Sequence, residues 1–233
     1  MLCASLSYIY FTINMDKIDI IFFVIYFGEL GIYRLSERLN KEVKMTNLIG
    51  KQLDEFKVNA FQAGKDFFQV TNEDLKGHWS VLFFYPGDFT FVCPTELEAL
   101  AEEYENFKKA GCEVYSVSTD SEFVHMEWQK TSPAVSKAKY VMLADRAFEL
   151  SRMLGVLNEE EGQAYRGSFV INPDGVITAY EIHDMGIGRS PKELLRKVEA
   201  SKFVNEHGDK VCPANWMPGE DTLTPGMDLV GTI

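Results

Sequence analysis

Cysteine and basic residues are both scarce in this sequence of 233 residues. The four cysteines are widely separated, with no CxxC pair and no cluster with histidine at the spacing of zinc ligands. This excludes a disulfide-rich secreted scaffold, argues against a dithiol disulfide reductase and gives no sign of a metal site. Because 23 Lys and Arg stand against 35 Asp and Glu, the net charge is −12. Nucleic acid and acidic lipid are therefore poor partners.

A long apolar run is missing as well. The main apolar stretch, residues 18–33, is interrupted by Asp19 and Glu29, and its unbroken part covers only residues 20–27. A helix that spans a bilayer needs about 20 mostly apolar residues. A signal peptide is not indicated, because the leader carries acidic residues and no small-residue cleavage site follows the apolar run. We therefore expect a cytoplasmic protein.

Residues 1–44 differ from the rest of the chain in charge. Their five basic and five acidic residues cancel, so the whole charge of −12 falls on the other 189 residues. The codons for residues 41–45, Lys-Glu-Val-Lys-Met, can contain a purine-rich bacterial ribosome-binding site just before a start codon. We hypothesise that Met45 is the true initiator and that residues 1–44 are a translated leader. The alternative is a genuine membrane-associating segment, and only then do we expect a membrane partner.

After Met45, patterns of strand and helix alternate. The apolar run Val81–Tyr85 is typical of a central strand buried on both faces. The apolar spacing of residues 94–109 predicts a helix. A second strand over 113–118 and a second helix over 121–130 complete a βαβ unit, in which the two strands are parallel.

Further along, the sequence predicts a hairpin and a last helix. Residues 168–172 and 176–182 flank the turn Asn-Pro-Asp-Gly. Ser190 is placed to cap a helix that begins at Pro191, with Glu193 closing a capping box. This order predicts an α/β fold, a thioredoxin-like sandwich with a central mixed β-sheet flanked by helices. We expect this domain over residues 45–204, followed by a Pro- and Gly-rich C-terminal tail over 205–233.

Cys93 lies at the start of the first predicted helix, directly before Pro94. Unpaired N–H groups and the positive end of the helix dipole favour an anion there, so we expect a partly ionised, nucleophilic thiol. Thr90, three residues earlier, can bring its hydroxyl beside the sulfur. Position alone also allows a small buried apolar residue at a strand–helix junction, which is a common place for cysteine.

The residues around Cys93 carry a resemblance to a known family. Pro86-x3-Thr90-x2-Cys93 is the active-site motif of peroxiredoxins. Four later segments match the same family in order, namely residues 115–120, 166–175, 211–216 and 228–231. The chain from Met45 onward therefore resembles the typical two-cysteine peroxiredoxins. Within them it is most similar to the bacterial peroxidase component of alkyl hydroperoxide reductase.

The resemblance implies a thiol peroxidase for hydrogen peroxide and organic hydroperoxides that uses no cofactor and no metal. Cys93 matches the peroxidatic cysteine, whose thiolate attacks peroxide and becomes a sulfenic acid. Arg166 matches the arginine that holds the thiolate and donates to peroxide oxygens. Thr90 would orient the peroxide, Pro86 would shield the thiolate, and Glu96 would orient the arginine. Taken alone, an arginine more often forms a surface salt bridge.

Cys212, in the tail, matches the resolving cysteine of the family. The resemblance implies a Cys93–Cys212 disulfide between subunits, a homodimer and a decamer of five dimers. It also implies a reductant that is a flavoprotein disulfide reductase or a thioredoxin-like protein. Spacing alone allows an ordinary exposed tail cysteine and a one-cysteine peroxidase, and a holdase chaperone assembly is a further alternative. We expect Cys112 to be a buried core thiol.

Overall fold

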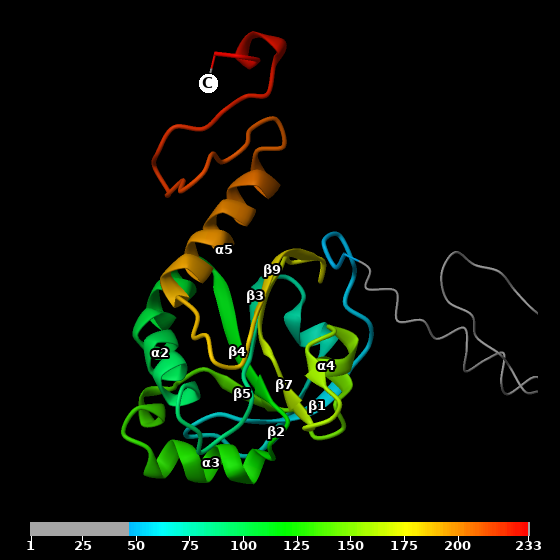
Figure 1. The fold of residues 1–233 in the computed structure, drawn as a ribbon, viewed down its shortest axis with the longest axis vertical. Coiled ribbons are helices and arrows are strands. Elements are labelled where there is room, and N and C mark those ends of the chain that lie inside the picture. The colour runs from blue at the N-terminus through cyan, green and yellow to red at the C-terminus, as the bar shows by residue number, and fades with distance from the viewer. Residues whose placement is uncertain (1–46, 233) are drawn as a thin grey trace, which may run out of the picture. The chain divides into compact units, whose positions relative to one another are not determined.

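The computed structural model describes residues 47–232, which fold around one mixed β-sheet (Figure 1). The leader hypothesis for residues 1–44 and the position of Cys3 lie outside these residues. The seven-stranded sheet has the order β2-β1-β5-β4-β3-β8-β9, and two short strands, β6 and β7, form a separate hairpin. The strands are β1 (Lys57–Phe61), β2 (Phe68–Thr71), β3 (Trp79–Phe84), β4 (Cys112–Ser118), β5 (Val141–Ala144), β6 (Leu157–Asn158), β7 (Gln163–Ala164), β8 (Arg166–Ile171) and β9 (Ile177–His183).

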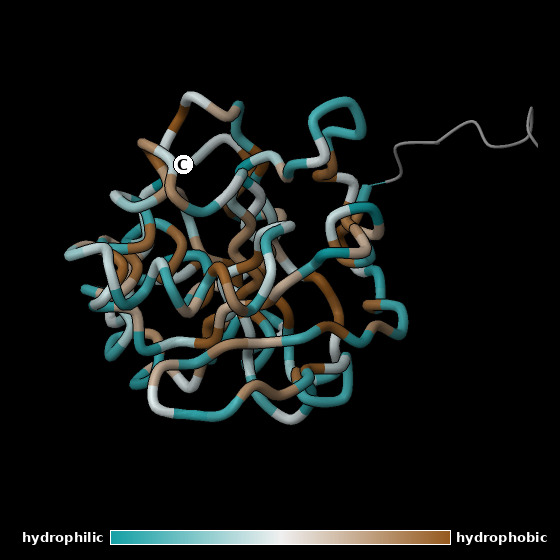
Figure 2. The backbone as a smooth tube through the Cα atoms, turned by 90° about the horizontal axis from the view of Figure 1, so that it is seen from below, coloured by the Kyte–Doolittle hydropathy of each residue, from teal (hydrophilic) through white to brown (hydrophobic). Residues whose placement is uncertain are grey.

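Helices cover both faces of the sheet, and their side chains form two apolar cores. The helices are α2 (Cys93–Lys109), α3 (Glu122–Thr131), α4 (Glu149–Met153) and α5 (Pro191–Glu206), with 3-10 turns η1 (Asn72–Leu75), η2 (Val135–Lys137) and η3 (Met227–Leu229). Figure 1 shows α2 and α5 on one side of the sheet and α4 on the other. Figure 2 shows apolar stretches running through the interior and polar segments in the outer loops.

Strand β3 links the two cores. All six of its residues are buried, and it pairs in parallel with β4 and antiparallel with β8. Because side chains alternate along a strand, Val81 and Phe83 enter the core beneath α2 and α5, whereas Leu82 and Phe84 enter the core on the α4 side. The prediction of a doubly buried central strand with a parallel neighbour is confirmed.

Helix α2 begins at Cys93, so the predicted first-turn position of this residue is confirmed. Its N-cap is Val92, and Pro94 occupies the first turn, where a missing N–H costs no hydrogen bond. The helix ends at Lys109, before Gly111, whose φ of +70° favours a residue without a Cβ atom. The thiol of Cys93 is therefore carried by the N-terminal turn of a helix that follows the central strand.

Helix α5 begins at Pro191 as predicted, but the predicted capping box is wrong. Ser190 Oγ accepts a hydrogen bond from the backbone N of Glu193 at 3.4 Å, which is one half of the motif. The Glu193 carboxylate instead binds Arg196 through two hydrogen bonds, of 2.7 and 2.8 Å. The charged fork of an arginine offers two donors with matching geometry, whereas the cap offers a single neutral N–H.

The tail after α5 folds back on itself. Val211 and Leu223 form an antiparallel bridge, and the buried side chain of Trp216 packs against Phe203 of α5 with 5.0 Å between ring centroids. In Figure 1 this segment continues beyond the end of α5. None of the helices within residues 47–232 combines the length and the apolar character needed to cross a bilayer.

Candidate active site

Cys93 lies at a buried site in which its sulfur contacts an arginine. The residue is only 1% exposed, and Arg166 Nη1 donates to Cys93 Sγ at 3.3 Å. The same nitrogen donates to Glu96 Oε2 at 2.6 Å. Arg166 begins β8, which runs antiparallel to β3, so it lies level with the end of β3 from which the chain leads into α2. Sheet topology thus brings together two residues that are 73 positions apart.

Glu96 binds a second arginine, Arg189, which precedes α5. Glu96 Oε1 accepts from the backbone N and from Nε of Arg189 at 2.8 and 2.9 Å, and Oε2 accepts from Nη2 at 3.2 Å. Burial alone would raise the pKa of Glu96, but the hydrogen bonds and charge of Arg189, with the charge of Arg166, lower it below its usual 4.5. The carboxylate is therefore ionised at neutral pH.

Arg189 is itself fixed on every side. Its Nη1 donates to the Gly167 carbonyl at 2.7 Å and to Ser168 Oγ at 3.1 Å, and the guanidinium carbon lies 3.5 Å from the centroid of the Phe83 ring. Sequence reasoning did not find this residue. No local pattern marks it, because its carboxylate partner is 93 residues away and only the fold brings the two together.

Arg166 is oriented by a backbone contact in addition to Glu96. Its Nε donates to the Met185 carbonyl at 2.7 Å, in the loop that leads from β9 to Arg189. Burial would lower the pKa of Arg166, but Cys93 and Glu96 together raise it, so the group stays charged. Taken alone, an arginine is more often part of a surface salt bridge. Arg166 is not, because its side chain is buried against Cys93 and Glu96.

The loop before α2 holds the other two residues of the motif. Pro86 is buried, whereas Thr90 is exposed and its Oγ1 donates to the Gly87 carbonyl at 2.8 Å. The hydroxyl proton of Thr90 is thus used within the loop, and its side-chain hydrogen bond is made to Gly87 rather than to Cys93. The oxygen lone pairs of Thr90 are left as acceptors.

A buried polar network anchors this loop to the rest of the domain. Asp88 accepts from the Tyr85 hydroxyl at 2.7 Å and contacts His125 Nδ1 at 2.8 Å. The backbone N of Asp88 donates to Asp120 Oδ2 at 2.8 Å. Burial, and then the negative charge of Asp88, raises the pKa of Tyr85. The anchors thus come from the residue after β3, from α3 and from the loop after β4, and they tie the chain just before Cys93 to three parts of the domain.

The other two cysteines of the described region lie outside this site. Cys212 is partly exposed on the tail, and its Sγ lies 3.9 Å from the Ala200 carbonyl of α5. Cys112 is 2% exposed, and burial raises the pKa of its thiol, so the prediction of a buried core thiol is confirmed. All three described cysteines are free thiols. Among residues 47–232, no group of three or more His, Cys, Asp or Glu is placed to hold a metal ion.

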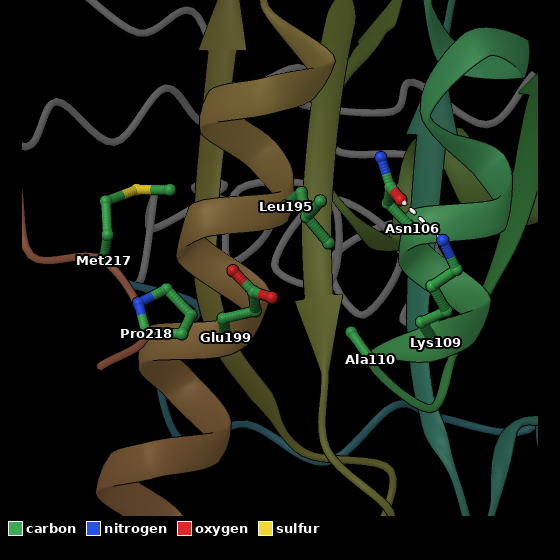
Figure 3. Close-up of a pocket in the computed structure, with 7 residues that line it drawn as sticks. All are labelled: Asn106, Lys109, Ala110, Leu195, Glu199, Met217 and Pro218. Carbon is green, nitrogen blue, oxygen red and sulfur yellow. Dashed lines mark hydrogen bonds between the residues drawn. The ribbon is translucent and has the colours of Figure 1, made fainter.

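A cavity of about 400 Å³ lies between α2, α5 and the tail (Figure 3). Asn106 and Lys109 face it from α2, and Leu195 and Glu199 face it from α5. None of the residues that line it belongs to the Cys93 site. The lining residues are Asn106, Lys109, Ala110, Leu195, Glu199, Met217 and Pro218.

Comparison with known proteins places this architecture in a family. Residues 49–180 match the family model described as the AhpC/TSA family, and residues 200–228 match the C-terminal domain of 1-Cys peroxiredoxin. The chain is 54% identical over 187 residues to alkyl hydroperoxide reductase C of Amphibacillus xylanus, which covers 80% of this chain and 100% of that protein. The corresponding protein of Bacillus subtilis is 53% identical over the same length and coverage.

Solved structures agree with this family assignment. The crystal structure of Enterococcus faecalis AhpC has a TM-score of 0.70 and 53% identity, covering 72% of this chain and 100% of that one. The reduced 2-Cys peroxiredoxin of Plasmodium vivax has a TM-score of 0.74 and 30% identity, covering 78% and 96%. The predicted thioredoxin-like fold and the family resemblance are confirmed. The fold and site define a thiol peroxidase of the peroxiredoxin class. Within that class, the chain belongs to the AhpC/TSA family.

Proposed function

We propose that this chain reduces hydrogen peroxide and organic hydroperoxides, with Cys93 as the peroxidatic thiol. The observation that carries the proposal is the 3.3 Å hydrogen bond from Arg166 to Cys93 Sγ, between two residues that are 3% and 1% exposed. A charged donor on sulfur favours the thiolate, which is the nucleophilic form. Counting charges, two arginines and the Glu96 carboxylate leave one positive charge, which a Cys93 thiolate neutralises.

In the first step, the Cys93 thiolate attacks one peroxide oxygen. A sulfur–oxygen bond forms while the oxygen–oxygen bond breaks, and the departing oxygen takes a proton to leave as water or an alcohol. Sulfur is oxidised to a sulfenic acid and the peroxide is reduced. Arg166 would stabilise charge on the departing oxygen. Glu96 and Arg189 hold Arg166 in place for this role.

The loop residues have supporting roles in this proposal. Thr90 already donates its proton to Gly87, so its oxygen would accept the hydrogen of the peroxide and orient it for in-line attack. The buried ring of Pro86 would keep water from the sulfur. No metal or cofactor is required, because sulfur supplies the electron pair.

Resolution requires a second thiol, and we assign it to Cys212 of a second protomer. The Cys212 thiolate attacks the sulfenic sulfur, a disulfide forms, and the hydroxide that leaves takes a proton and becomes water. Because Cys93 is 1% exposed within a helical turn, the first turn of α2 must unwind for the sulfurs to meet. The domain is then 45–204, and the tail 205–233 carries the resolving thiol.

The remaining parts of the cycle follow from the same proposal. A dithiol protein, either a flavoprotein disulfide reductase or a thioredoxin-like protein, returns two electrons to the disulfide. The working assembly is a homodimer, with five dimers in a ring, and it acts in the cytoplasm.

The experiment is a non-reducing gel of the reduced protein after one equivalent of hydrogen peroxide. We expect a covalent dimer for the wild type and for Cys112→Ser, and none for Cys93→Ser or Cys212→Ser. If the wild type consumes peroxide but stays monomeric, a one-cysteine or intrachain mechanism replaces the intersubunit one. If no peroxide is consumed, the peroxidase proposal fails and a holdase role becomes the leading hypothesis.

A further inference from the structure

The tail around Cys212 is held on one face of α5 by Arg196. Arg196 Nη1 donates to the Trp216 carbonyl at 3.4 Å. Cys212 Sγ lies 3.9 Å from the carbonyl of Ala200, which is four residues after Arg196 and therefore on the same helix face. The segment from Cys212 to Trp216 thus lies along this face, with the guanidinium at one end and the sulfur one helical turn away.

Arg196 is not free to move away from this position. Its Nε and Nη2 are bound by the two oxygens of Glu193, at 2.7 and 2.8 Å, which leaves Nη1 directed to the tail. Trp216 adds an apolar anchor, since it is 3% exposed and packs on Phe203. The pair formed by Glu193 and Arg196, whose side chains are 42% and 22% exposed, therefore acts as a clamp that is directed to the tail.

The charge of Arg196 acts on the thiol of Cys212. Burial raises the pKa of Cys212, and the positive charge of Arg196 opposes that rise. In return, Cys212 contributes to the raised pKa of Arg196, after the larger effect of Glu193. Glu220 of the tail accepts from Trp216 Nε1 through its carbonyl and from the backbone N of Met217 through its carboxylate. The other titratable residues of α5 and the tail are Lys192, Glu193, Lys197, Glu199, Lys202, Glu206, His207, Asp209, Lys210, Asp221 and Asp228.

We propose that Arg196 is a positioning residue for the resolution step, because its contact with the Trp216 carbonyl keeps the segment that carries Cys212 on the face of α5 that bears the guanidinium. This inference rests on the proposed role of Cys212 as the resolving thiol. Only the ionised sulfur attacks the sulfenic acid, so a larger thiolate fraction speeds formation of the disulfide. The clamp therefore keeps the second thiol ready until the first turn of α2 unwinds.

The first test does not depend on peroxide. In a Cys93→Ser background, the rate of alkylation of Cys212 by iodoacetamide is measured from pH 6 to 10, with each labelled peptide quantified by mass spectrometry. We expect Arg196→Gln to raise the pH midpoint of the alkylation profile by about half a pH unit to one pH unit. This lowers the rate of Cys212 alkylation at pH 7 by about 3- to 10-fold. Arg196→Lys, which keeps the charge, should stay close to the background protein.

The matched control is Lys192→Gln. Lys192 is exposed on the same helix, four residues before Arg196, so this change removes the same charge without touching the tail. Its alkylation profile should coincide with that of the background protein. The inference is overturned if the profile of Arg196→Gln also coincides with that of the background protein. It is equally overturned if Lys192→Gln shifts the midpoint as much as Arg196→Gln does.

The second test follows disulfide formation in the chain with Cys93 intact. After a pulse of peroxide, we expect Arg196→Gln to accumulate sulfenic acid and to form the disulfide several-fold more slowly than Lys192→Gln. An unchanged rate of disulfide formation would contradict a role in resolution, even if alkylation shifts. If no variant consumes peroxide, the proposed peroxidase function fails, and the alkylation profiles still decide whether Arg196 acts on Cys212.

Discussion

At the scale of single residues, the candidate site depends on one buried carboxylate. Glu96 is 3% exposed and binds both Arg166 and Arg189, so it holds two positive charges in the protein interior. An isolated buried charge is costly, and a paired one is retained only where its hydrogen bonds are complete. The arrangement is stable as a set and is sensitive to the loss of any member.

Replacing Arg189 should damage both stability and activity. In Arg189→Met, Glu96 loses the side-chain donors Nε on Oε1 and Nη2 on Oε2 and keeps only the backbone N–H of residue 189. Breaking a buried pair costs about 3–5 kcal/mol. We expect the rate of Cys93 oxidation to fall roughly 10- to 100-fold, because a small displacement of Arg166 misplaces the donor on sulfur. Urea unfolding and stopped-flow oxidation measure the two effects. Arg152→Met, which breaks an exposed arginine–carboxylate pair with Glu159, is the control and should change neither.

The stability that Glu96 provides should disappear in acid. Since its pKa in the folded protein is below 4.5, its contribution is complete above that pH and is lost as the pH falls through the lowered value. Glu96→Gln should therefore be less stable than the wild type by about 3 kcal/mol at pH 7, with the difference shrinking below pH 4.5. Urea titrations at pH 7, 5, 4 and 3 measure this difference. A constant difference across this range, or an equal effect of the exposed Glu160→Gln, would contradict it.

At the scale of elements, two helix ends carry or contact the cysteines of the proposed mechanism. The first turn of α2 carries Cys93 and the last turns of α5 hold Cys212. The first end is fixed by the loop network of Asp88 and His125, and the second by the contacts of Trp216 with α5. These anchors differ in kind, because the first is a set of buried hydrogen bonds and the second is mainly one aromatic side chain.

Removing Trp216 should release the tail without unfolding the domain. Trp216→Ala deletes the ring that packs on Phe203, and each 1.4 kcal/mol of lost docking raises the open fraction about 10-fold. We therefore expect the rate of trypsin cleavage after Lys210 to rise about 10-fold or more. The urea midpoint of the domain should stay unchanged. Met227→Ala, at a residue of the tail that is 87% exposed, is the control. Equal cleavage rates for the two variants would show that Trp216 is not the anchor.

At the scale of the whole molecule, the surface exposes several large aromatic residues. Phe67 and Phe123 contact each other with 4.8 Å between ring centroids, and they are 39% and 59% exposed. Phe91, two residues before Cys93, is 93% exposed. Exposed aromatic groups of this kind are typical of interaction surfaces. They are consistent with the proposed assembly of dimers.

A charge placed among these aromatic residues should weaken the larger assembly. We expect Phe123→Glu to shift the reduced protein from decamers toward dimers in analytical ultracentrifugation, because burying an unpaired carboxylate opposes association. Thermal unfolding of the protomer should change little, since the side chain is exposed. Ile49→Glu, at another exposed apolar residue, serves as the comparison. If both variants remain decameric, Phe67 and Phe123 do not form the contact between dimers.

Local patterns were enough to predict much of the fold. β3, α2, β4, α3, the β8–β9 hairpin and α5 were expected from apolar spacing, turn residues and helix caps, and each is present. β1, β2, β5 and α4 were not assigned. β2, β5 and α4 have only four or five residues each, and β1 pairs with β5 across about eighty residues. Segments this short depend on distant partners more than on their own sequence.

The sequence by itself determined that Cys93 lies at the start of a helix, with Thr90 three residues before it. The resemblance added the motif that includes Pro86 and the proposed roles of Arg166, Glu96 and Cys212. Only the tertiary structure decided that Arg189 completes the carboxylate cluster and that Glu193 binds Arg196 instead of closing the helix cap. The reason is physical. A motif fixes the order of groups along the chain, whereas the partner of a charged side chain depends on strand register and helix packing over many residues.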